Sequence, residues 1–429
     1  MEKDADKITA AAATDAEPNA SADAAQKSAV ERSAPSDERL LKPRERNVNL
    51  DLLKVFAVLF IVIHHLTINN IGVDGVTFSF IADGAIPGGA LTTVLVSEFI
   101  DAFVIIGVNI FFLISGYFSI HFKLSKVFSL LVKVYVYFCV GELIAYLAGL
   151  TSFDSPADAV IECLTAPAKY WFILVYVAIS VFAPLFNKFV ESLSAKSARY
   201  FTVVSLLLFC IVGFVADFFG EFIGTKEGYA PLWGFVVYIY GRLIARFGFG
   251  LKRKPSFWAV MYIVCALLNY AVVAAVTAAA GDGKWAWHLY SYNNPLVLAA
   301  SVAFCMIFIT AKPLPAAGKA AKLIVTLAGR SLGVYLLHSN NPLISPYRAF
   351  LVDLCAADTL WLQYVLLLPD VLILFVALSA ADFLFDKIST RPIAAFAGML
   401  SRAIERLYTF ILKIAGRLFG TDKEETPTP

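Results

Sequence analysis

Residues 49–66, NLDLLKVFAVLFIVIHHL, place charged and imidazole side chains within an otherwise apolar run. Lys54 and His65 are eleven residues apart, so in a helix they return to within about 20° of one face, about 16 Å apart along the axis. Asp51 precedes Lys54 by three residues and can pair with it. A neutral imidazole is a suitable general base, and burial favours the neutral form. One face would therefore carry an ion pair at one end and an imidazole at the other, with His64 about 100° away. Such residues inside a membrane normally mark function; the alternative is that Lys54 only snorkels and His65 hydrogen-bonds a neighbouring helix.

The composition identifies the solvent that surrounds these residues. Of the 429 residues 59% are hydrophobic and 16% charged, and the mean hydropathy is +0.74. Soluble domains are only about 45–50% apolar. The apolar runs are near the roughly 20 residues that a helix needs to cross a bilayer, and a run of that length favours helix over strand. We therefore predict an all-α, polytopic membrane bundle. Its ten expected spans are 49–69, 97–120, 125–149, 169–189, 200–219, 230–247, 256–280, 294–311, 322–341 and 362–386.

Lysine and arginine in the connecting loops predict the orientation. Residues 66–96 and 150–168 contain neither residue, whereas the alternate connections are basic. Basic short loops stay on the cytoplasmic side, so both termini are expected there. We predict a disordered cytoplasmic tail over 1–46, because it is rich in Ala, Asp and Ser, and a transmembrane domain over 47–390. Residues 391–429 are expected to form a cytoplasmic amphipathic helix and a short tail, because basic residues recur there at helical spacing.

Several kinds of site have no sequence signal. The six cysteines are scattered and show no CxxC spacing, so they indicate neither a metal site nor a disulfide framework. No glycine-rich phosphate loop and no nucleic-acid motif is present. We therefore expect no bound metal and no nucleic-acid partner.

Four segments together resemble a known family. The K-x(10)-H spacing of Lys54 and His65 is followed by GVNIFFLISGYF (107–118). KYWFILVYVAISVFAPLFNKFV (169–190) and SLGVYLLHSNNP (331–342) follow later in the chain. This combination resembles the acyltransferase 3 family of multi-spanning bacterial membrane O-acyltransferases, particularly the branch that modifies exopolysaccharides.

The resemblance implies an enzyme that moves an acyl group, usually acetyl, from cytoplasmic acyl-CoA to a hydroxyl of an extracytoplasmic glycan. Acyl-CoA would be the donor substrate, and no bound cofactor is implied. By position the family's essential histidine falls on His65, and its basic residue, usually Arg, falls on Lys54. The family's polar position and Ser-Gly-aromatic turn fall on Asn109, Ser115, Gly116 and Tyr117. Many members carry a Glu where this chain has Tyr176.

Further residues are secondary candidates. Lys123 and Lys126 would help Lys54 to hold the CoA phosphates, or they only follow the positive-inside rule. His338, with Asn340 and Asn341, lies near the expected outer end of its span, as does Asp101 with Glu98. Either group could orient His65, because a carboxylate fixes the tautomer of a histidine in catalytic triads. Trp171 is a candidate sugar-stacking platform, whereas we expect Tyr170 to belong to the aromatic belt.

A transporter or flippase for a glycan or lipid-linked sugar is the alternative, with His65 as a proton relay. Such proteins often have two related halves or helices broken at matching positions, and neither is visible here. The enzyme is therefore the preferred interpretation, in a bacterial cytoplasmic membrane with the bilayer, acyl-CoA and a glycan as partners.

Overall fold

The computed structural model describes residues 46–70, 72–73, 76–77, 86, 91–220, 224–281, 283–340, 342–347 and 360–419. Contacts divide the chain into residues 1–46 and 47–429, and the second unit is described below. The tail predicted over 1–46 lies, except for Arg46, outside the described residues, as does Asn341.

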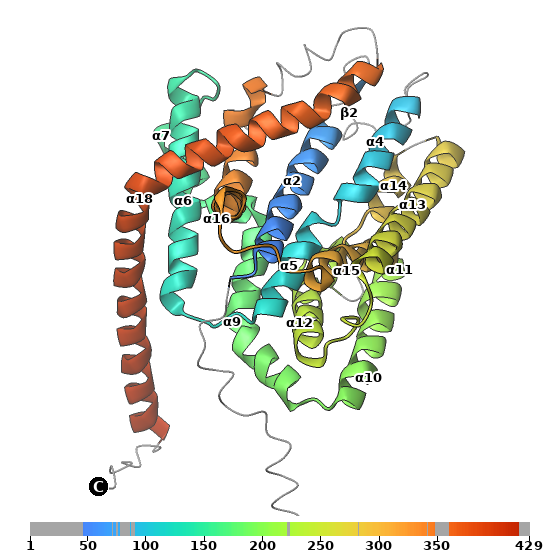
Figure 1. The fold of residues 1–429 in the computed structure, drawn as a ribbon. Helices are drawn as coiled ribbons and strands as arrows, with labels where there is room; N and C mark the ends of the chain where they lie inside the picture. Colours follow the sequence, from blue (N-terminus) through green and yellow to red (C-terminus); the bar gives the residue numbers. More distant parts are fainter. Residues whose placement is uncertain are drawn as a thin grey trace, which may run out of the picture. The chain divides into compact units, whose positions relative to one another are not determined.

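The described chain is helical apart from one short antiparallel pair of strands, β1 (Gly72–Val73) and β2 (Val76–Thr77). In this pair Gly72 is opposite Thr77 and Val73 is opposite Val76. The predicted all-α class is thereby confirmed for the described residues. The longer helices are α2 (Val48–Asn70), α4 (Leu91–Val104), α5 (Gly107–Phe118), α6 (Leu124–Leu147), α9 (Trp171–Ser192), α10 (Ala195–Ser205), α12 (Pro231–Phe247), α13 (Pro255–Ala280), α15 (Pro295–Thr310), α16 (Lys319–His338) and α18 (Leu360–Phe419) (Figure 1). Shorter elements are α7 (Pro156–Leu164), α8 (Ala166–Lys169), the π-helix η2 (Leu206–Val212), α11 (Gly213–Asp217), η3 (Lys226–Gly228) and α14 (Lys284–Leu289).

Eight helical stretches in the described part are long and apolar enough to cross a membrane, rather than the ten that we expected. The two missing spans, 230–247 and 294–311, do form helices. These are α12 and α15, which have only 17 and 16 residues. Their bounds agree with the expected ranges, but both helices are shorter than the roughly 20 residues of a typical span, so the count of ten stays a prediction. The sides on which the two termini lie stay a prediction.

Three of the expected spans differ internally from a simple helix. The span expected over 97–120 is divided into α4 and α5 at Ile105 and Ile106. The span expected over 200–219 is composed of α10, η2 and α11 in succession. The last expected span and the amphipathic segment belong to one helix, α18, with Pro369 and Pro392 inside it. Figure 1 shows α18 changing direction sharply, and proline is the commonest cause of such a kink.

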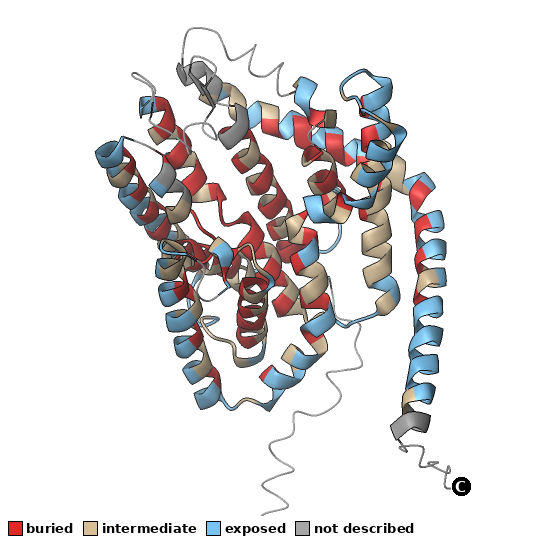
Figure 2. Ribbon diagram, turned by 180° about the vertical axis from the view of Figure 1, so that it is seen from behind, coloured by how far each residue is buried: buried red, intermediate tan, exposed pale blue. Residues whose placement is uncertain are grey.

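The core is formed where α5 packs against α12 and α2. Close approach of α5 and α12 depends on Gly116, because a Cβ atom there would overlap the carbonyl oxygen of Tyr238. Helix α2 lies between α5 and α16, and Figure 2 shows that buried residues concentrate on the central helices while exposed residues lie on the outer ones. The residues predicted to do chemistry on α2 are therefore held in the interior of the bundle.

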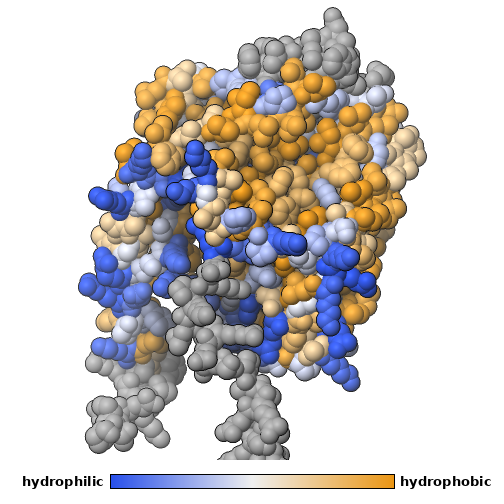
Figure 3. Space-filling model, in the orientation of Figure 1, coloured by the Kyte–Doolittle hydropathy of each residue, from blue (hydrophilic) through white to orange (hydrophobic). Residues whose placement is uncertain are grey.

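The surface fits a membrane environment. Figure 3 shows apolar side chains covering a continuous region of the face that it draws, with hydrophilic side chains gathered below. Many large apolar residues are exposed on the outer helices, including Leu207 on η2 and Val260 on α13. Exposed apolar surface of this extent is stable against lipid hydrocarbon and costly in water. The chain is therefore a multi-pass membrane protein.

Candidate active site

Helix α2 carries the predicted site residues along its length. Lys54 lies in its second turn, and His64 and His65 lie in its second half. Eleven residues of helix between Lys54 and His65 correspond to about 16 Å along the axis. The buried side of α2 contacts α5, α15 and α16, so residues from several helices can reach both ends of this face.

His65 is held by a second histidine from α16. Its Nδ1 atom lies 2.8 Å from Nε2 of His338, and the two rings are stacked at 5.0 Å between centroids. The other nitrogen of His338, Nδ1, lies 2.9 Å from the carbonyl oxygen of Val334. Sequence analysis named His338 as a candidate partner of His65, and the structure brings the two rings together.

These contacts favour one arrangement of protons when both rings are neutral. The carbonyl oxygen of Val334 can only accept, so Nδ1 of His338 must donate to it. In the neutral form Nε2 of His338 is then an acceptor, and Nδ1 of His65 donates to it. The lone pair of neutral His65 is consequently on Nε2. The contacts therefore select the tautomer of His65 that a general base needs.

The carboxylate expected near His65 belongs to the other histidine. Oδ1 of Asp101 lies 2.6 Å from Nδ1 of His64, and both side chains are buried. The suggestion that Asp101 orients His65 directly is therefore wrong, because α4 faces the side of α2 from which His64 projects. Glu98, one turn earlier on α4, instead accepts a hydrogen bond of 2.6 Å from the Thr277 hydroxyl.

A small cavity of about 30 Å³, here called the histidine cavity, adjoins both α2 histidines. Aromatic rings form much of its wall, and the break between α4 and α5 contributes Val104, Ile105 and Val108. The full lining is Ile61, His64, His65, Val104, Ile105, Val108, Trp171, Phe172, Tyr292 and Tyr335. Its volume admits little more than a water molecule or a single small reacting group, so a larger substrate needs side-chain movement to reach His65.

A larger cavity of about 270 Å³, here called the lysine cavity, extends from Lys54. Ser115 and Tyr176 line it from α5 and α9, and α16 contributes a third side. The lysine cavity and the histidine cavity share three lining residues, Ile61, Phe172 and Tyr335. The two cavities are therefore neighbours that border the same three side chains, so the space beside Lys54 lies next to the space beside His65.

Lys54 is positioned by two neighbours. Its Nζ atom lies 3.2 Å from Oδ1 of Asp51 and 5.3 Å from the centroid of the Phe118 ring. The side chain of Lys54 is 30% exposed and that of Asp51 is 6% exposed, so the cation is the more accessible member of the pair. Lys123 and Lys126 are exposed at the start of α6, and neither is among the residues that line the lysine cavity.

The residues of the Ser-Gly-aromatic segment have separate structural positions. Ser115 lines the lysine cavity, and its hydroxyl donates to the carbonyl oxygen of Phe111 at 2.7 Å. Tyr117 packs against the core and its ring contacts Phe118. Asn109 is fully buried, where it accepts from Nε1 of Trp233 at 3.0 Å and donates to the carbonyl oxygen of Tyr292 at 2.9 Å. Asn109 therefore joins α5 to α12 and to the loop before α15, rather than lining either cavity.

Aromatic residues on the far side of the histidine cavity pack together. The centroid of the Trp171 ring lies 4.5 Å from the ring centroid of Tyr229 and 5.7 Å from that of Tyr292. Burial raises the pKa of Tyr229 to about 12, so its phenol is neutral near pH 7. Tyr170 is buried, and its hydroxyl donates to the carbonyl oxygen of Leu336 at 3.1 Å. The expected place of Tyr170 in an aromatic belt is therefore wrong, because its hydroxyl is used inside the bundle.

Sequence reasoning missed most of the cavity walls. Tyr335 lies three residues before His338, and this helical spacing places both on one side of α16, so the signal was available. Phe172 follows Trp171 directly and is one of many apolar residues in its span, which hides its role. Tyr292 lies in a loop far from α2 in the sequence, and no local pattern indicates its position.

Comparison with known protein families identifies the family of this chain. Residues 47–381, which is more than half of the chain, match the acyltransferase 3 family model, described as an acyltransferase domain. No curated protein and no solved structure matched the chain. The matched range begins just before α2 and ends within α18. It therefore includes the lysine cavity, the histidine cavity, and the contacts of His64 with Asp101 and of His65 with His338. The chain therefore belongs to the acyltransferase 3 family of membrane acyltransferases.

Proposed function

We propose that this protein is an O-acyltransferase that transfers an acetyl group from cytoplasmic acetyl-CoA to a hydroxyl of a glycan on the opposite side of a bacterial cytoplasmic membrane. The observation that carries the proposal is the contact between His65 and His338, because it leaves the basic lone pair on Nε2 of His65. An intramembrane ionisable residue is costly and normally marks function. Membership of an acyltransferase family supports the reaction class.

In the proposed reaction Nε2 of His65 accepts the proton of the attacking hydroxyl, and the oxygen of that hydroxyl bonds to the thioester carbonyl carbon. The tetrahedral intermediate then collapses, the carbon–sulfur bond breaks, and the thiolate takes the proton back from His65. A positioned base contributes about 10²–10⁴-fold to such a step. His338 acts as the acceptor for Nδ1–H of His65, so it stabilises the imidazolium while the proton resides there.

The donor is proposed to enter through the lysine cavity. Lys54 is available there for a CoA phosphate as a point charge, in place of the bidentate contact that Arg would make. The pantetheine arm is thin, and the roughly 16 Å between Lys54 and His65 suits an extended chain that passes Ile61, Phe172 and Tyr335. The glycan would approach from the other side, where Trp171 and Tyr292 line the histidine cavity.

The test is acyl transfer by the purified full-length protein in sealed vesicles. Radiolabelled acetyl-CoA is supplied on one side, and polysaccharides whose O-acetyl groups have been removed by alkali are supplied on the other. We expect thiol release together with label in a polysaccharide. His65→Ala should abolish both signals, whereas Ser180→Ala, a buried hydroxyl on α9 that lines neither cavity, should retain them. Wild-type rates equal to those of His65→Ala across all acceptors would contradict the proposal.

A further inference from the structure

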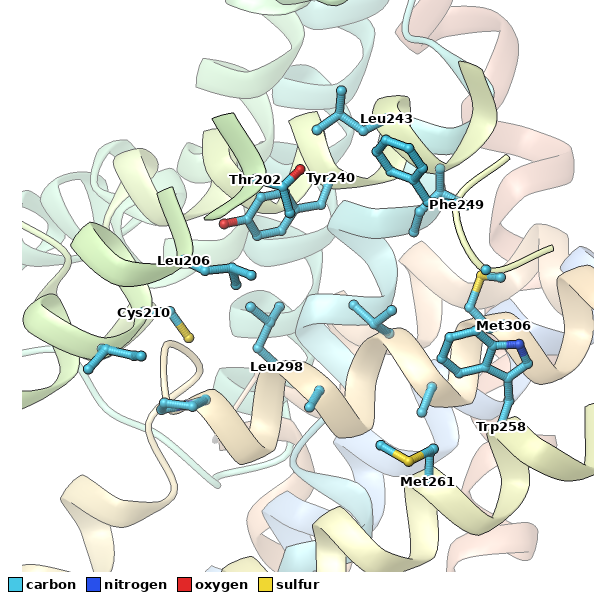
Figure 4. Close-up of a pocket in the computed structure, with 17 residues that line it drawn as sticks. Thr202, Leu206, Cys210, Tyr240, Leu243, Phe249, Trp258, Met261, Leu298 and Met306 are labelled. Carbon is cyan, nitrogen blue, oxygen red and sulfur yellow. The ribbon is translucent and has the colours of Figure 1, made fainter. Parts of the chain in front are cut away.

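A cavity larger than the lysine cavity and the histidine cavity lies apart from both histidines. Its volume is about 500 Å³, which is within the range of ligand-binding pockets. This apolar cavity lies between α10, η2, α12, α13 and α15 (Figure 4). Residues on several sides of it are Leu206, Cys210, Tyr240, Phe249, Trp258 and Met306. None of these residues lines the lysine cavity or the histidine cavity.

The polar groups in its wall are almost all used within the protein. The Thr202 hydroxyl donates to the carbonyl oxygen of Ala198 at 2.8 Å, and the hydroxyl of Tyr240 pairs with that of Ser205 at 2.9 Å. The Cys210 thiol donates to the carbonyl oxygen of Asn293 at 3.1 Å. Among the described lining residues, only Nε1 of Trp258 has no partner. An ordered water needs two to four polar partners, so the cavity suits a hydrocarbon ligand.

The helices beside the cavity are the most peripheral of the candidate spans. In the most apolar 18-residue stretch of 195–217, 17% is buried inside the protein, and in that of 255–280, 22% is buried. The corresponding share for 91–118 is 72%. Many large hydrophobic side chains are exposed on both stretches, including Leu207 and Val260, and such surface suits contact with lipid. The wall also includes η2, a π-helix, and π-helical turns are rare and frequent at functional sites. The molecules available at the mouth of this cavity are therefore membrane lipids.

The charge near the cavity favours one class of lipid. Six exposed cations flank its lining residues: Lys196, Arg199, Arg246, Lys252, Arg253 and Lys254. These residues, here called the basic rim, lie within segments 193–202 and 243–260, neither of which contains Asp or Glu. Thr202 is one helical turn after Arg199, and Phe249 and Gly250 line the cavity just before Lys252. None of the six is in an ion pair within the described chain. Basic clusters of this kind attract anionic phospholipid headgroups.

We propose that the apolar cavity holds one acyl chain of an anionic phospholipid whose phosphate is bound by the basic rim. The chain meets apolar surroundings both in the cavity and in the bilayer, so selectivity comes from the headgroup. Because each Lys or Arg near the membrane surface adds to the attraction for anionic lipid, and several act together here, we expect a preference for phosphatidylglycerol over phosphatidylcholine of at least about tenfold. This site does not depend on the proposed acyl transfer.

The test uses quenching of Trp258 fluorescence by lipids with brominated acyl chains. Full-length protein is placed in phosphatidylcholine nanodiscs with increasing fractions of brominated phosphatidylglycerol or brominated phosphatidylcholine. The chain has six tryptophans, so the Trp258 signal is the difference between wild type and Trp258→Phe. We expect half-maximal quenching by brominated phosphatidylglycerol at a fraction at least about tenfold lower. Equal quenching by the two lipids, or no quenching of Trp258 by either, would overturn the proposal.

Two variants separate the roles of cavity and charge. Ala299→Phe, which places a ring inside the cavity, should abolish the saturable quenching. The triple variant Lys252→Gln, Arg253→Gln and Lys254→Gln changes only exposed side chains, so it should fold, and it should remove the preference for phosphatidylglycerol. The matched control changes Lys312, Lys319 and Lys322 to Gln in another basic connection and should keep the preference. A triple basic-rim variant that keeps the full preference would refute the role of the rim.

Discussion

Nδ1 of His65 and Nε2 of His338 lie 2.8 Å apart, although 273 positions separate the two residues in the sequence. The contact joins the second half of α2 to the last turn of α16, and the carbonyl oxygen of Val334 continues it on α16. The contact therefore depends on how α2 and α16 pack together. Substitutions of His338 that keep this packing test the contact itself.

The first prediction concerns the acceptor for His65. His338→Ala removes the atom that accepts from Nδ1 of His65, and leaving a donor inside the protein without its partner costs about 1–3 kcal/mol. We expect kcat to fall about 10- to 100-fold, with the KM values for donor and acceptor nearly unchanged.

His338→Gln is the matched control, because its side-chain carbonyl is again an acceptor. Steady-state kinetics of the three proteins at equal folded concentration decide the question. If His338→Gln is as impaired as His338→Ala, packing rather than the hydrogen bond explains the loss.

The second prediction concerns donor binding. Lys54→Ala should raise the apparent KM for acyl-CoA and leave the dependence on the acceptor nearly unchanged, whereas Lys54→Arg should preserve or improve donor binding through its planar fork. Asp51→Ala should give a milder donor defect, because it removes the partner at 3.2 Å but keeps the charge of Lys54. An unchanged KM for acyl-CoA in a well-folded Lys54→Ala protein would show that Lys54 only snorkels.

The third prediction assigns Asn109 to stability. Asn109→Ala leaves the indole N–H of Trp233 and the carbonyl oxygen of Tyr292 without their partner, and an unsatisfied buried group costs about 1–3 kcal/mol. Thermal unfolding in detergent should occur at a lower temperature, with both KM values retained in the fraction that stays folded. Ser301→Ala is the comparison, because the hydroxyl of this buried residue donates to the carbonyl oxygen of Val297 within α15, and it should unfold near the wild-type temperature. A wild-type melting temperature for Asn109→Ala would refute the structural role.

The fourth prediction concerns a charged cluster between α6, α16 and α18. The buried Asp382 side chain accepts from the Tyr137 hydroxyl at 2.5 Å and from Arg330 at 2.9 Å. A Cβ on Gly333 would overlap Oδ1 of Asp382, so Gly333→Ala must displace this carboxylate from its partners. Breaking a buried pair costs about 3–5 kcal/mol, and we expect a marked drop in the melting temperature.

Gly329→Ala on the same helix provides the control. A Cβ there has no atom within 4 Å, and replacing a helical Gly by Ala is worth about 0.5–1 kcal/mol in favour of the helix. Its melting temperature should therefore equal or exceed that of the wild type. Equal melting temperatures for the two alanine variants would show that Asp382 can move without cost.

Local chemistry in the sequence was enough to predict the solvent and the principal helix. The apolar content and run lengths predicted a membrane bundle, because backbone groups in lipid must be satisfied within helices. The spacing of Lys54 and His65 placed them along one face of α2, because helical periodicity depends only on neighbours along the chain. The resemblance carried by four segments of the sequence predicted the family to which the chain belongs.

Only the packed structure shows which side chains meet. Asp101 contacts His64 and His338 contacts His65, although spacing along the chain left both as candidate partners of His65. The choice depends on how α4 and α16 are rotated against α2, and this rotation follows from close packing of the whole bundle, as where Gly116 lets α5 approach α12. Contacts between residues far apart in the chain have no local signature, since they arise from the summed packing of every helix in the interior.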